Sequence, residues 1–227
     1  MGPEIILILI LGGLAALDMT EAWQTMFYQP LVSATLIGLI LGDLKAGIQA
    51  GIFLQLLYFW VVPLGVVLFP DTSLGGVFGA TTFILLQKNF PPEPDKIIFL
   101  TLLFTLWFSI FCEIFVIFHR KKNSLWVKWV EKNLEKDKFK INQAVFFELL
   151  ISFLRGAILT GLGILIINYV IFPFFKFLDF LPNNYFVWCK WGLYGFALAS
   201  IFSFFGKKKN LVWIGWGIVL AGLTLFL

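Results

Sequence analysis

The apolar stretch from Gln29 to Ala80 constrains the fold of this chain most, because polar and turn-forming residues break it at short intervals. The polar turn Gly42-Asp43-Leu44-Lys45, Pro63 and the Pro70-Asp71 step divide it into three apolar blocks. Helix-breaking sequence at this spacing is unusual in a chain that is otherwise strongly apolar. The stretch therefore predicts several short helices rather than full membrane spans.

The lengths of these blocks support this prediction. Leu31–Leu41 has 11 residues, or about 16 Å of helix, against roughly 30 Å of hydrocarbon in a bilayer. Ala46–Val62 reaches about 26 Å and Leu74–Gln87 about 21 Å. Interrupted helices persist at membrane depth only where protein buries them or a water-filled cavity receives their freed backbone groups. In transporters such segments mark the substrate site.

The composition places the chain among multi-span membrane proteins. Sixty percent of its 227 residues are hydrophobic, 13% are charged and the mean hydropathy is +0.93. We expect one all-α domain over residues 1–227: a polytopic helical bundle with broken or re-entrant helices in its first half and one interfacial amphipathic helix. Ile5–Leu17 lacks a basic leader, so we expect it to be a short tilted span or a re-entrant half rather than a signal peptide.

Charge predicts the topology of the remaining chain. Residues 1–96 form the broken-helix region, and Ile97–Phe118 is a 22-residue span that ends in basic sequence. Residues 119–144 then form a cytoplasmic interfacial helix, in which Asn123–Asn142 has an apolar stripe with two tryptophans. A solvated linker is the alternative.

The remaining spans occupy residues 145–227. Among them Tyr185–Phe205 is expected to cross to Lys207–Lys209, on the same side as the first basic cluster, and Leu211–Leu227 to cross back. The loops Phe90–Lys96 and Phe172–Tyr185 carry little excess charge and are expected to share the outer face. Most of the basic residues lie in these two membrane-flanking clusters, so the net charge of +4 does not indicate nucleic-acid binding.

Asp71 is the strongest candidate for a functional residue. It follows Pro70 between apolar sequences, where an ionised carboxylate is costly unless it is paired or hydrated. The alternative is that Asp71 caps a helix that begins near Thr72. The two roles are compatible, because a capping carboxylate retains lone pairs that accept hydrogen bonds from sugar hydroxyls.

Polar groups in the preceding blocks are further candidates. Gln55 lies within an apolar block, and its amide matches the donor and acceptor needs of sugar hydroxyls, although a helix–helix hydrogen bond is the alternative. Gln49 is a similar case. Asp43 and Lys45 flank a turn after Gly42. Their opposite charges either are ordinary at the tip of a hairpin or close one side of a sugar path. Gln29 is expected to cap the start of the same hairpin. Tyr58 and Trp60 are candidates for stacking on a sugar.

The chain lacks the motifs of an enzyme active site. It has one histidine, His119, and no Cys-x-x-Cys, His-Glu-x-x-His, Gly-x-Ser-x-Gly or P-loop pattern. We therefore expect no cofactor, no metal centre and no catalytic residue. Cys112 and Cys189 lie far apart in apolar segments and are expected to be free thiols. Glu148 and Arg155, seven residues apart on one helix face, are expected to have a structural role.

Several spaced motifs resemble the IIC membrane subunit of the mannose/fructose/sorbose class of bacterial sugar phosphotransferase systems. In chain order they are Gln29-Pro30-Leu31-Val32, Gly38, Leu41-Gly42-Asp43-Leu44-Lys45-Ala46-Gly47, Leu54-Gln55-Leu56 and Pro70-Asp71. The resemblance is clear over the first third of the chain. It implies a hexose site that includes Asp71, Thr72, Gln55, Gln49, Asp43, Lys45 and Gln29.

The resemblance also implies partners. A IID membrane subunit would complete the translocation unit, and the soluble IIB and IIA phosphocarriers would supply the phosphoryl group, within an oligomeric complex in the bacterial cytoplasmic (inner) membrane. His119 is not expected to be the phosphohistidine. Two other classes stay open from the residues alone: the substrate-capture subunit of an ATPase-driven vitamin or metal importer, and a degenerate membrane scaffold that does not transport.

Overall fold

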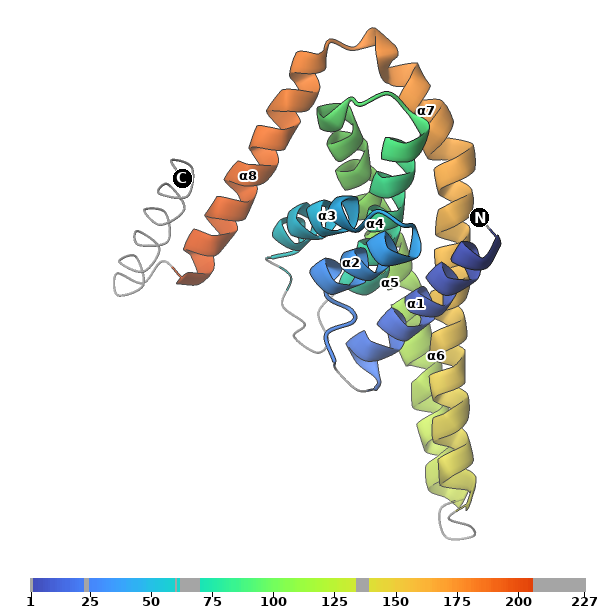
Figure 1. Cartoon of the computed structure of the whole chain (residues 1–227). Coiled ribbons are helices and arrows are strands. Elements are labelled where there is room, and N and C mark those ends of the chain that lie inside the picture. The colour runs from blue at the N-terminus through green and yellow to red at the C-terminus, as the bar shows by residue number, and fades with distance from the viewer. Residues whose placement is uncertain (1, 23–24, 60, 62–69, 134–138, 206–227) are drawn as a thin grey trace.

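The computed structural model describes residues 2–22, 25–59, 61, 70–133 and 139–205. Helices dominate these residues (Figure 1). In chain order they are α1 (Gly2–Thr20), α2 (Pro30–Ile40), α3 (Leu44–Leu57), α4 (Thr72–Asn89), α5 (Pro94–Asn133), α6 (Phe139–Ile166), a π-helical turn (Ile167–Ile171), α7 (Phe172–Phe177), a 3₁₀ turn (Leu178–Phe180) and α8 (Asn183–Phe205). The expectation of an all-helical membrane bundle is confirmed.

Helix α4 forms the centre of the bundle. Every residue from Thr72 to Leu86 is buried, and α2, α3, α5, α1 and α6 all pack against it. A helix that is apolar on all sides is the kind that a bundle encloses. Its glycines let neighbours approach closely, since a Cβ on Gly76 would lie 3.0 Å from the Cα of Pro30. The interrupted segments of the first half therefore pack around this enclosed helix.

Helices α2 and α3 form a tight hairpin whose backbones touch. A Cβ on Gly47 would lie 2.7 Å from the Cα of Gly38, so neither position accommodates a side chain without displacement. Gly42 has φ +72°, which glycine adopts at little cost, and Asp43 caps α3 by accepting a hydrogen bond from the Ala46 N–H at 2.9 Å. The Gly-Asp-Leu-Lys-Ala-Gly motif is thus the sequence of a helical hairpin.

The predicted short helices of the first half are confirmed, whereas the first segment is longer than expected. At 11 and 14 residues, α2 and α3 measure about 16 and 21 Å. Helix α1 has 19 residues, about 28 Å, and is long enough to cross a membrane. The segment predicted from the sequence, Ile5–Leu17, is shorter because it stops before the charged residue Asp18. In the structure Asp18 is buried and hydrogen-bonded, so the helix continues past it.

Helix α5 differs from the predicted boundaries. Pro94–Asn133 is one continuous helix, so no separate interfacial helix begins at residue 119 or 123. Its far end runs beside the start of α6 as a long hairpin that extends below the bundle (Figure 1). The sequence at 119–124 contains neither proline nor glycine, and nothing interrupts the helix there. The amphipathic stripe therefore belongs to the extended end of α5, and Leu134 lies outside the described residues.

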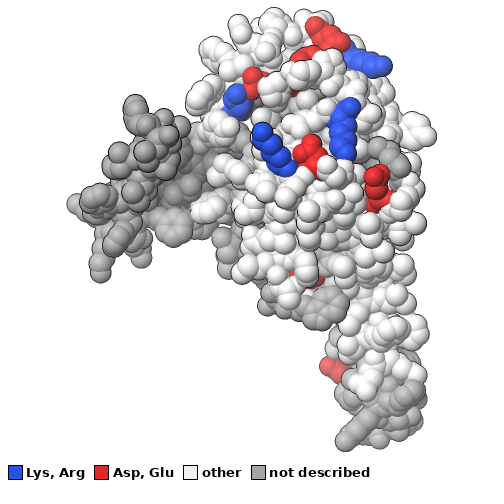
Figure 2. Space-filling view, viewed as in Figure 1, with Lys and Arg blue, Asp and Glu red and all other residues white. Residues whose placement is uncertain are grey.

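The opposite end of the bundle is held by ion pairs that join the start of α5 to the 3₁₀ turn after α7 and to α8. Lys96, which is 1% exposed, pairs with Asp179 and lies 4.1 Å from the ring centroid of Phe175. Lys190 Nζ pairs with Asp95 at 2.5 Å. The two connections predicted to share a membrane face therefore lie side by side. Figure 2 shows charged side chains mostly towards this end of the viewed face and a largely uncharged surface below it.

A short π-helical turn joins α6 to α7. Residues 172–185 were expected to form a loop, but the helical path continues almost to residue 180. Pro173 lacks an N–H and its ring crowds the carbonyl one turn earlier, and the wider π turn at Ile167–Ile171 precedes it.

Three helical stretches of the described chain are long and apolar enough to cross a membrane: Gly2–Met19, Pro94–Lys128 and Asn142–Phe180. Helix α8 covers the predicted crossing at Tyr185–Phe205. The last predicted crossing, Leu211–Leu227, and the basic triplet Lys207–Lys209 lie outside the described residues.

We expect Gly47→Ala to destabilise the protein, because its new methyl group would meet the backbone of Gly38 and the carbonyl oxygen of Ala34, each 2.7 Å away. Overpacking of this kind costs about 1–3 kcal/mol. Gly192→Ala on α8 is the matched control, since its Cβ would meet nothing within 4 Å and it removes a helical glycine. Thermal unfolding in detergent measures both. A melting temperature for Gly47→Ala at or above that of the control would contradict the hairpin packing.

Candidate functional site

The candidate site centres on Asp71, which begins the central helix inside the apolar bundle. Its side chain is only 1% exposed. Its Oδ1 accepts hydrogen bonds from the Ser73 N–H at 3.0 Å, the Leu74 N–H at 3.1 Å and the Ser73 hydroxyl at 2.6 Å. The backbone N–H donors at the start of a helix need such an acceptor when water is excluded. The helix-capping interpretation of Asp71 is therefore confirmed.

Asp71 also joins α4 to α5. Its backbone N–H donates a hydrogen bond to the Ser109 carbonyl of α5 at 3.1 Å. Tyr58, at the end of α3, lies next to this contact: its hydroxyl donates to the Thr105 carbonyl at 3.4 Å, and a Cβ on Gly75 would lie 2.4 Å from that hydroxyl. Hydroxyl groups and one carboxylate thus gather where α3, α4 and α5 meet.

A small cavity adjoins the start of α4. Its volume is about 60 Å³, well below the roughly 300–1,000 Å³ of ligand pockets. Two of the three glutamines predicted to bind sugar, Gln29 and Gln55, contribute to its lining, together with Thr72, the residue after Asp71. The remaining lining residues are Met19, Tyr28, Pro30, Tyr58 and Val61.

Gln55 connects the two helices of the hairpin. Its Oε1 accepts a hydrogen bond from the Leu31 N–H at 3.3 Å, which satisfies a donor in the first turn of α2. The helix–helix hydrogen bond considered from the sequence is therefore present. Because that bond engages the carbonyl oxygen of the side chain, the amide nitrogen is the group through which Gln55 can donate towards the cavity it lines.

Gln29 lies at the N-cap of α2, but its side chain does not cap the helix. The prediction that Gln29 caps the hairpin is wrong in this respect, since Gln55 supplies the acceptor instead. The side chain of Gln29 donates a long hydrogen bond, 3.5 Å, to the hydroxyl of Tyr28, and it lines the cavity. The backbone of Gln29 is extended, with ψ 128°, as expected for a residue directly before proline.

Asp71 is not among the residues that line the cavity, although the next residue, Thr72, is. Three further predicted residues also lie apart from it. Gln49 and Lys45 are exposed on α3 and do not line it. Asp43 is engaged as the cap of α3, so the turn interpretation considered for it is confirmed. The hairpin geometry explains the separation, since α3 rises about 1.5 Å per residue and carries its first residues away from the end that bears Gln55. Trp60 lies outside the described residues.

Sequence reasoning missed the carboxylate that orders the segment in front of α2. Asp18 is fully buried, and its two oxygens accept hydrogen bonds from the Thr25 hydroxyl at 2.8 Å and the Tyr28 N–H at 3.1 Å. These bonds hold Tyr28 beside the cavity. The available signal was an aspartate directly after an apolar helical run, which is costly at membrane depth unless partnered.

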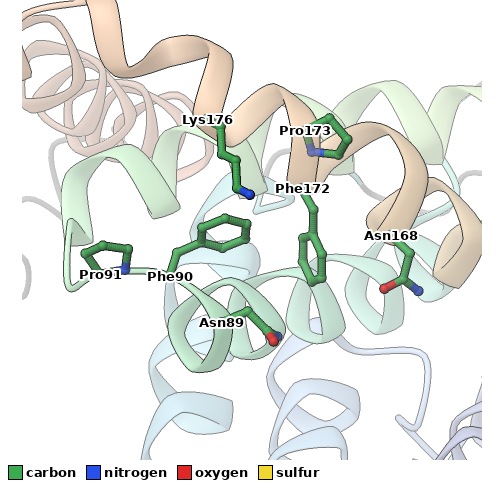
Figure 3. A pocket seen from close by; sticks show the side chains of 7 residues that line it. All are labelled: Asn89, Phe90, Pro91, Asn168, Phe172, Pro173 and Lys176. Atoms are coloured by element: carbon green, nitrogen blue, oxygen red, sulfur yellow. The ribbon is translucent and has the colours of Figure 1, made fainter.

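A larger hollow lies at the other end of the bundle, beside the α4–α5 turn and α7. Its volume is about 580 Å³. Figure 3 shows the Lys176 amine and the rings of Phe90 and Phe172 around one opening, with the amides of Asn89 and Asn168 near its edge. None of the residues predicted from the sequence lines this hollow.

The chain matches the family described as "PTS system sorbose-specific IIC component" over residues 3–224. A chain that matches over nearly its whole length belongs to that family. It is a multi-pass membrane protein of the class suggested by the motifs of its first third, and the match supports the IIC interpretation over an importer subunit or a scaffold.

Curated relatives resemble its first part in sequence. The fructose permease IIC component of Bacillus subtilis is 37% identical over 87 residues, which is 38% of this chain and 32% of the relative. The sorbose-specific EIIC component of Klebsiella pneumoniae is 35% identical over 83 residues, which is 36% of this chain and 30% of the relative. The mannose-specific EIIC component of Escherichia coli K12 is 29% identical over 82 residues, again 36% and 30%. The matched segments thus span about a third of these relatives.

Two solved structures share the fold. One, titled only as a membrane protein, superposes with a TM-score of 0.72 at 18% identity, covering 100% of this chain and 96% of the other. The second belongs to a cryo-EM structure of the mannose transporter ManYZ with microcin E492. It superposes with a TM-score of 0.63 at 17% identity, covering 98% of this chain and 87% of the other. At this identity the likeness establishes the fold alone.

We expect Asp71→Ala to lower the stability of the protein by about 1–2 kcal/mol, because the first turn of α4 loses its cap in a buried setting. Asp71→Asn retains an oxygen acceptor, and asparagine is as good a cap as aspartate, so its loss is expected to stay within about 0.5 kcal/mol. Thermal unfolding in detergent compares the two. Equal losses for Asn and Ala would show that the charge of Asp71, rather than its capping oxygen, stabilises this helix.

Proposed function

We propose that this chain is the sugar-translocating IIC subunit of a bacterial phosphoenolpyruvate-dependent sugar phosphotransferase system. The observation that carries the proposal is the buried carboxylate of Asp71 at the start of α4, directly before Thr72, which lines a cavity together with Gln29 and Gln55. All the hydrogen bonds described for this carboxylate fall on Oδ1. Lone pairs of Oδ2 are then the acceptors for sugar hydroxyls.

The donors and acceptors suit a hexose. A sugar ring presents adjacent hydroxyls that each donate and accept, and the site combines a charged acceptor, amide donors and a hydroxyl. Tyr58 and Pro30 add apolar surface beside them. The curated relatives carry names that refer to fructose, sorbose and mannose. A hexose is therefore the substrate class we propose.

The residues of the proposed site belong to two packed units, the α2–α3 hairpin and α4, and this division indicates how the cavity opens. Gln29 and Gln55 belong to the α2–α3 hairpin, whereas Asp71 and Thr72 begin α4. The cavity between them, at about 60 Å³, is too small for a hexose. Movement of the hairpin relative to α4 and α5 would enlarge it, and in transporters such motion of one rigid unit against another gives alternating access.

The chain requires partners for phosphorylation. It carries no phosphotransfer motif, and its single histidine lies between two carboxylates, which would repel a phosphoryl group. We propose that a soluble IIB subunit, charged by IIA, phosphorylates the sugar, and that a IID membrane subunit completes the translocation path. The solved mannose transporter of similar fold is titled as ManYZ. The complex would lie in the bacterial cytoplasmic membrane.

Uptake of radiolabelled mannose, fructose and sorbose tests the site, in cells that lack their own hexose transporters and express this chain with its companion subunits. We expect Asp71→Asn to lower the apparent affinity roughly tenfold to a hundredfold while leaving the protein in the membrane, because hydrogen bonds to a charged group contribute about 1.5–3 kcal/mol.

Two glutamines of α3 provide the matched comparison. Gln55→Ala is expected to weaken uptake, since Gln55 lines the cavity, whereas Gln49→Ala, exposed on the same helix, is expected to leave it unchanged. Uptake at the level of the unmodified chain in both Asp71→Asn and Gln55→Ala would remove the proposed site. Absence of hexose uptake by the unmodified complex would contradict the proposed function.

A further inference from the structure

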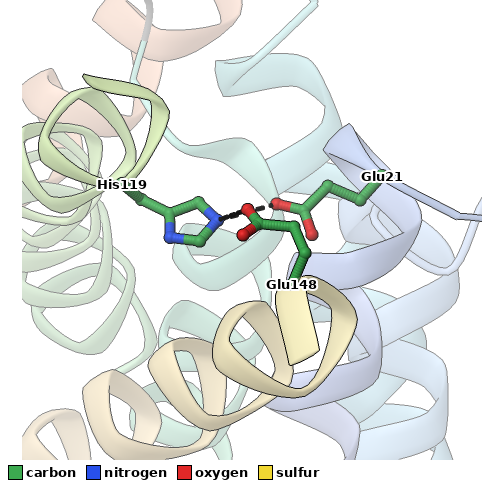
Figure 4. A group of neighbouring side chains, drawn as sticks. All are labelled: Glu21, His119 and Glu148. Carbon is green, nitrogen blue, oxygen red and sulfur yellow. Dashed lines mark ion pairs between the residues drawn. The ribbon is translucent and has the colours of Figure 1, made fainter. Parts of the chain in front are cut away.

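A second polar cluster, which shares no residue with the lining of the proposed sugar site, lies where the α5–α6 hairpin leaves the bundle. It consists of Glu21 just after α1, His119 on α5, and Glu148 and Ser152 on α6. Figure 4 shows the two carboxylates on the same side of the imidazole ring. On α5 the next three residues are exposed, so the cluster marks the limit of the packed bundle.

The polar atoms of this cluster converge on one nitrogen. His119 Nε2 lies 2.7 Å from Glu148 Oε1, 3.2 Å from Glu21 Oε1 and 2.9 Å from Ser152 Oγ. The hydroxyl of Ser152 donates to Glu21 Oε1. One ligand atom from each of the histidine and the two glutamates lies within 4.8 Å of the others. Three helical segments thus each present one nitrogen or oxygen ligand to a common point.

A proton on the imidazole accounts for only part of this arrangement. An Nε2–H directed at the Ser152 hydroxyl, which in turn donates to Glu21, leaves Glu148 Oε1 facing the same nitrogen without a hydrogen bond. Glu148 Oε1 is buried and makes no hydrogen bond despite its distance of 2.7 Å, so it lies out of line with the ring N–H direction. Neighbouring oxygen and nitrogen atoms without a hydrogen between them repel unless a cation lies close to both.

We propose that Glu21, His119 and Glu148 bind a divalent transition-metal ion of the zinc type. Ligands about 2.0–2.2 Å from such an ion are themselves roughly 3.0–3.6 Å apart. The separation of Nε2 from Glu21 Oε1, 3.2 Å, lies in this range, whereas Glu148 Oε1, at 2.7 Å, would move outward by a few tenths of an ångström when an ion binds. Imidazole with carboxylates suits Zn²⁺, whereas Mg²⁺ and Ca²⁺ take oxygen ligands. Two carboxylates and a neutral imidazole balance the charge of one such ion.

The surroundings allow an ion to enter and be retained. The side chains of His119, Glu21 and Glu148 are 10%, 15% and 18% exposed, so the site is largely enclosed but reachable from water. Ser152 is fully buried and orients Glu21 through its hydroxyl. Arg120, Lys121 and Lys122 are exposed, so solvent screens their charges. The bound ion would link α1 to the base of the α5–α6 hairpin.

Zinc binding to the full-length chain tests the proposal. The protein is purified in detergent without a polyhistidine tag, stripped with a chelator and titrated with Zn²⁺ against a chromophoric competitor, while melting temperature is followed. We expect one Zn²⁺ per chain and a higher melting temperature, and no such rise with Mg²⁺. His119→Gln and Glu148→Gln are expected to weaken binding by at least the roughly 10- to 100-fold that loss of a mere outer-shell partner causes.

Matched variants separate this site from others. Glu113→Gln lies on α5 six residues before His119 and outside the cluster, and Cys189→Ser removes the exposed thiol; both are expected to bind Zn²⁺ as the unmodified chain does. His119 is the chain's one histidine, so no second imidazole can substitute.

Cobalt spectroscopy of the unmodified chain provides a result even if a variant fails to fold. We expect visible d–d bands of nitrogen and oxygen ligation without a thiolate charge-transfer band. A thiolate band, stoichiometric binding unchanged in His119→Gln, or no stoichiometric Zn²⁺ in the unmodified chain would overturn the proposal and leave a hydrogen-bonded ion-pair network. Sugar uptake is not needed for any of these measurements, so the outcome is independent of the proposed transport function.

Discussion

The start of a helix inside an apolar bundle is the constraint on which the first half of this protein depends. A helix that begins at residue 72 leaves backbone N–H groups without partners, and no bulk water is available there to satisfy them. Asp71 satisfies two of them with one oxygen, and its own N–H reaches the Ser109 carbonyl of α5. The same carboxylate is the group proposed to bind sugar. Asp71 thus caps α4 and is also the residue proposed to bind the sugar.

Close backbone packing is the second requirement, and it explains the motifs shared with the family. Gly38 and Gly47 bring α2 and α3 into contact, Gly76 admits Pro30 to α4, and Gly156 lies against the Gly12 carbonyl where α1 crosses α6. Within a membrane the hydrophobic effect does not drive helices together. Small residues that permit close approach therefore supply much of the free energy of helix association. The Gly-Asp-Leu-Lys-Ala-Gly segment is therefore chiefly a packing motif, and it positions Gln55 next to α2 and the cavity.

The two ends of the bundle are held by different polar contacts. At one end Lys96 and Lys190 pair with Asp179 and Asp95, which fastens the α7–α8 connection to the start of α5. At the other, Glu21, His119 and Glu148 connect α1 with α5 and α6. Both sets of charges lie towards the ends of membrane-spanning stretches, where water lowers the cost of retaining charge. The broken-helix region between them can then rearrange while its frame stays joined.

The sequence by itself determined the helical membrane class, the short helices of the first half and the position of Asp71 at the start of a helix, because hydropathy, proline and glycine positions and isolated charges act locally. It also identified the family, through motifs that fold mostly as one hairpin. It predicted that a helix ends at residue 118, whereas α5 continues to Asn133. The reason is that charged residues continue a helix as readily as they end one. Only the tertiary structure decided which polar groups share a site. It brought Gln29, Gln55 and Thr72 to one cavity, left Gln49, Asp43 and Lys45 outside it, and gathered Glu21, His119 and Glu148 from three segments up to 127 positions apart. The physical reason is that side chains so distant in sequence meet only through helix packing, and no local pattern records that packing.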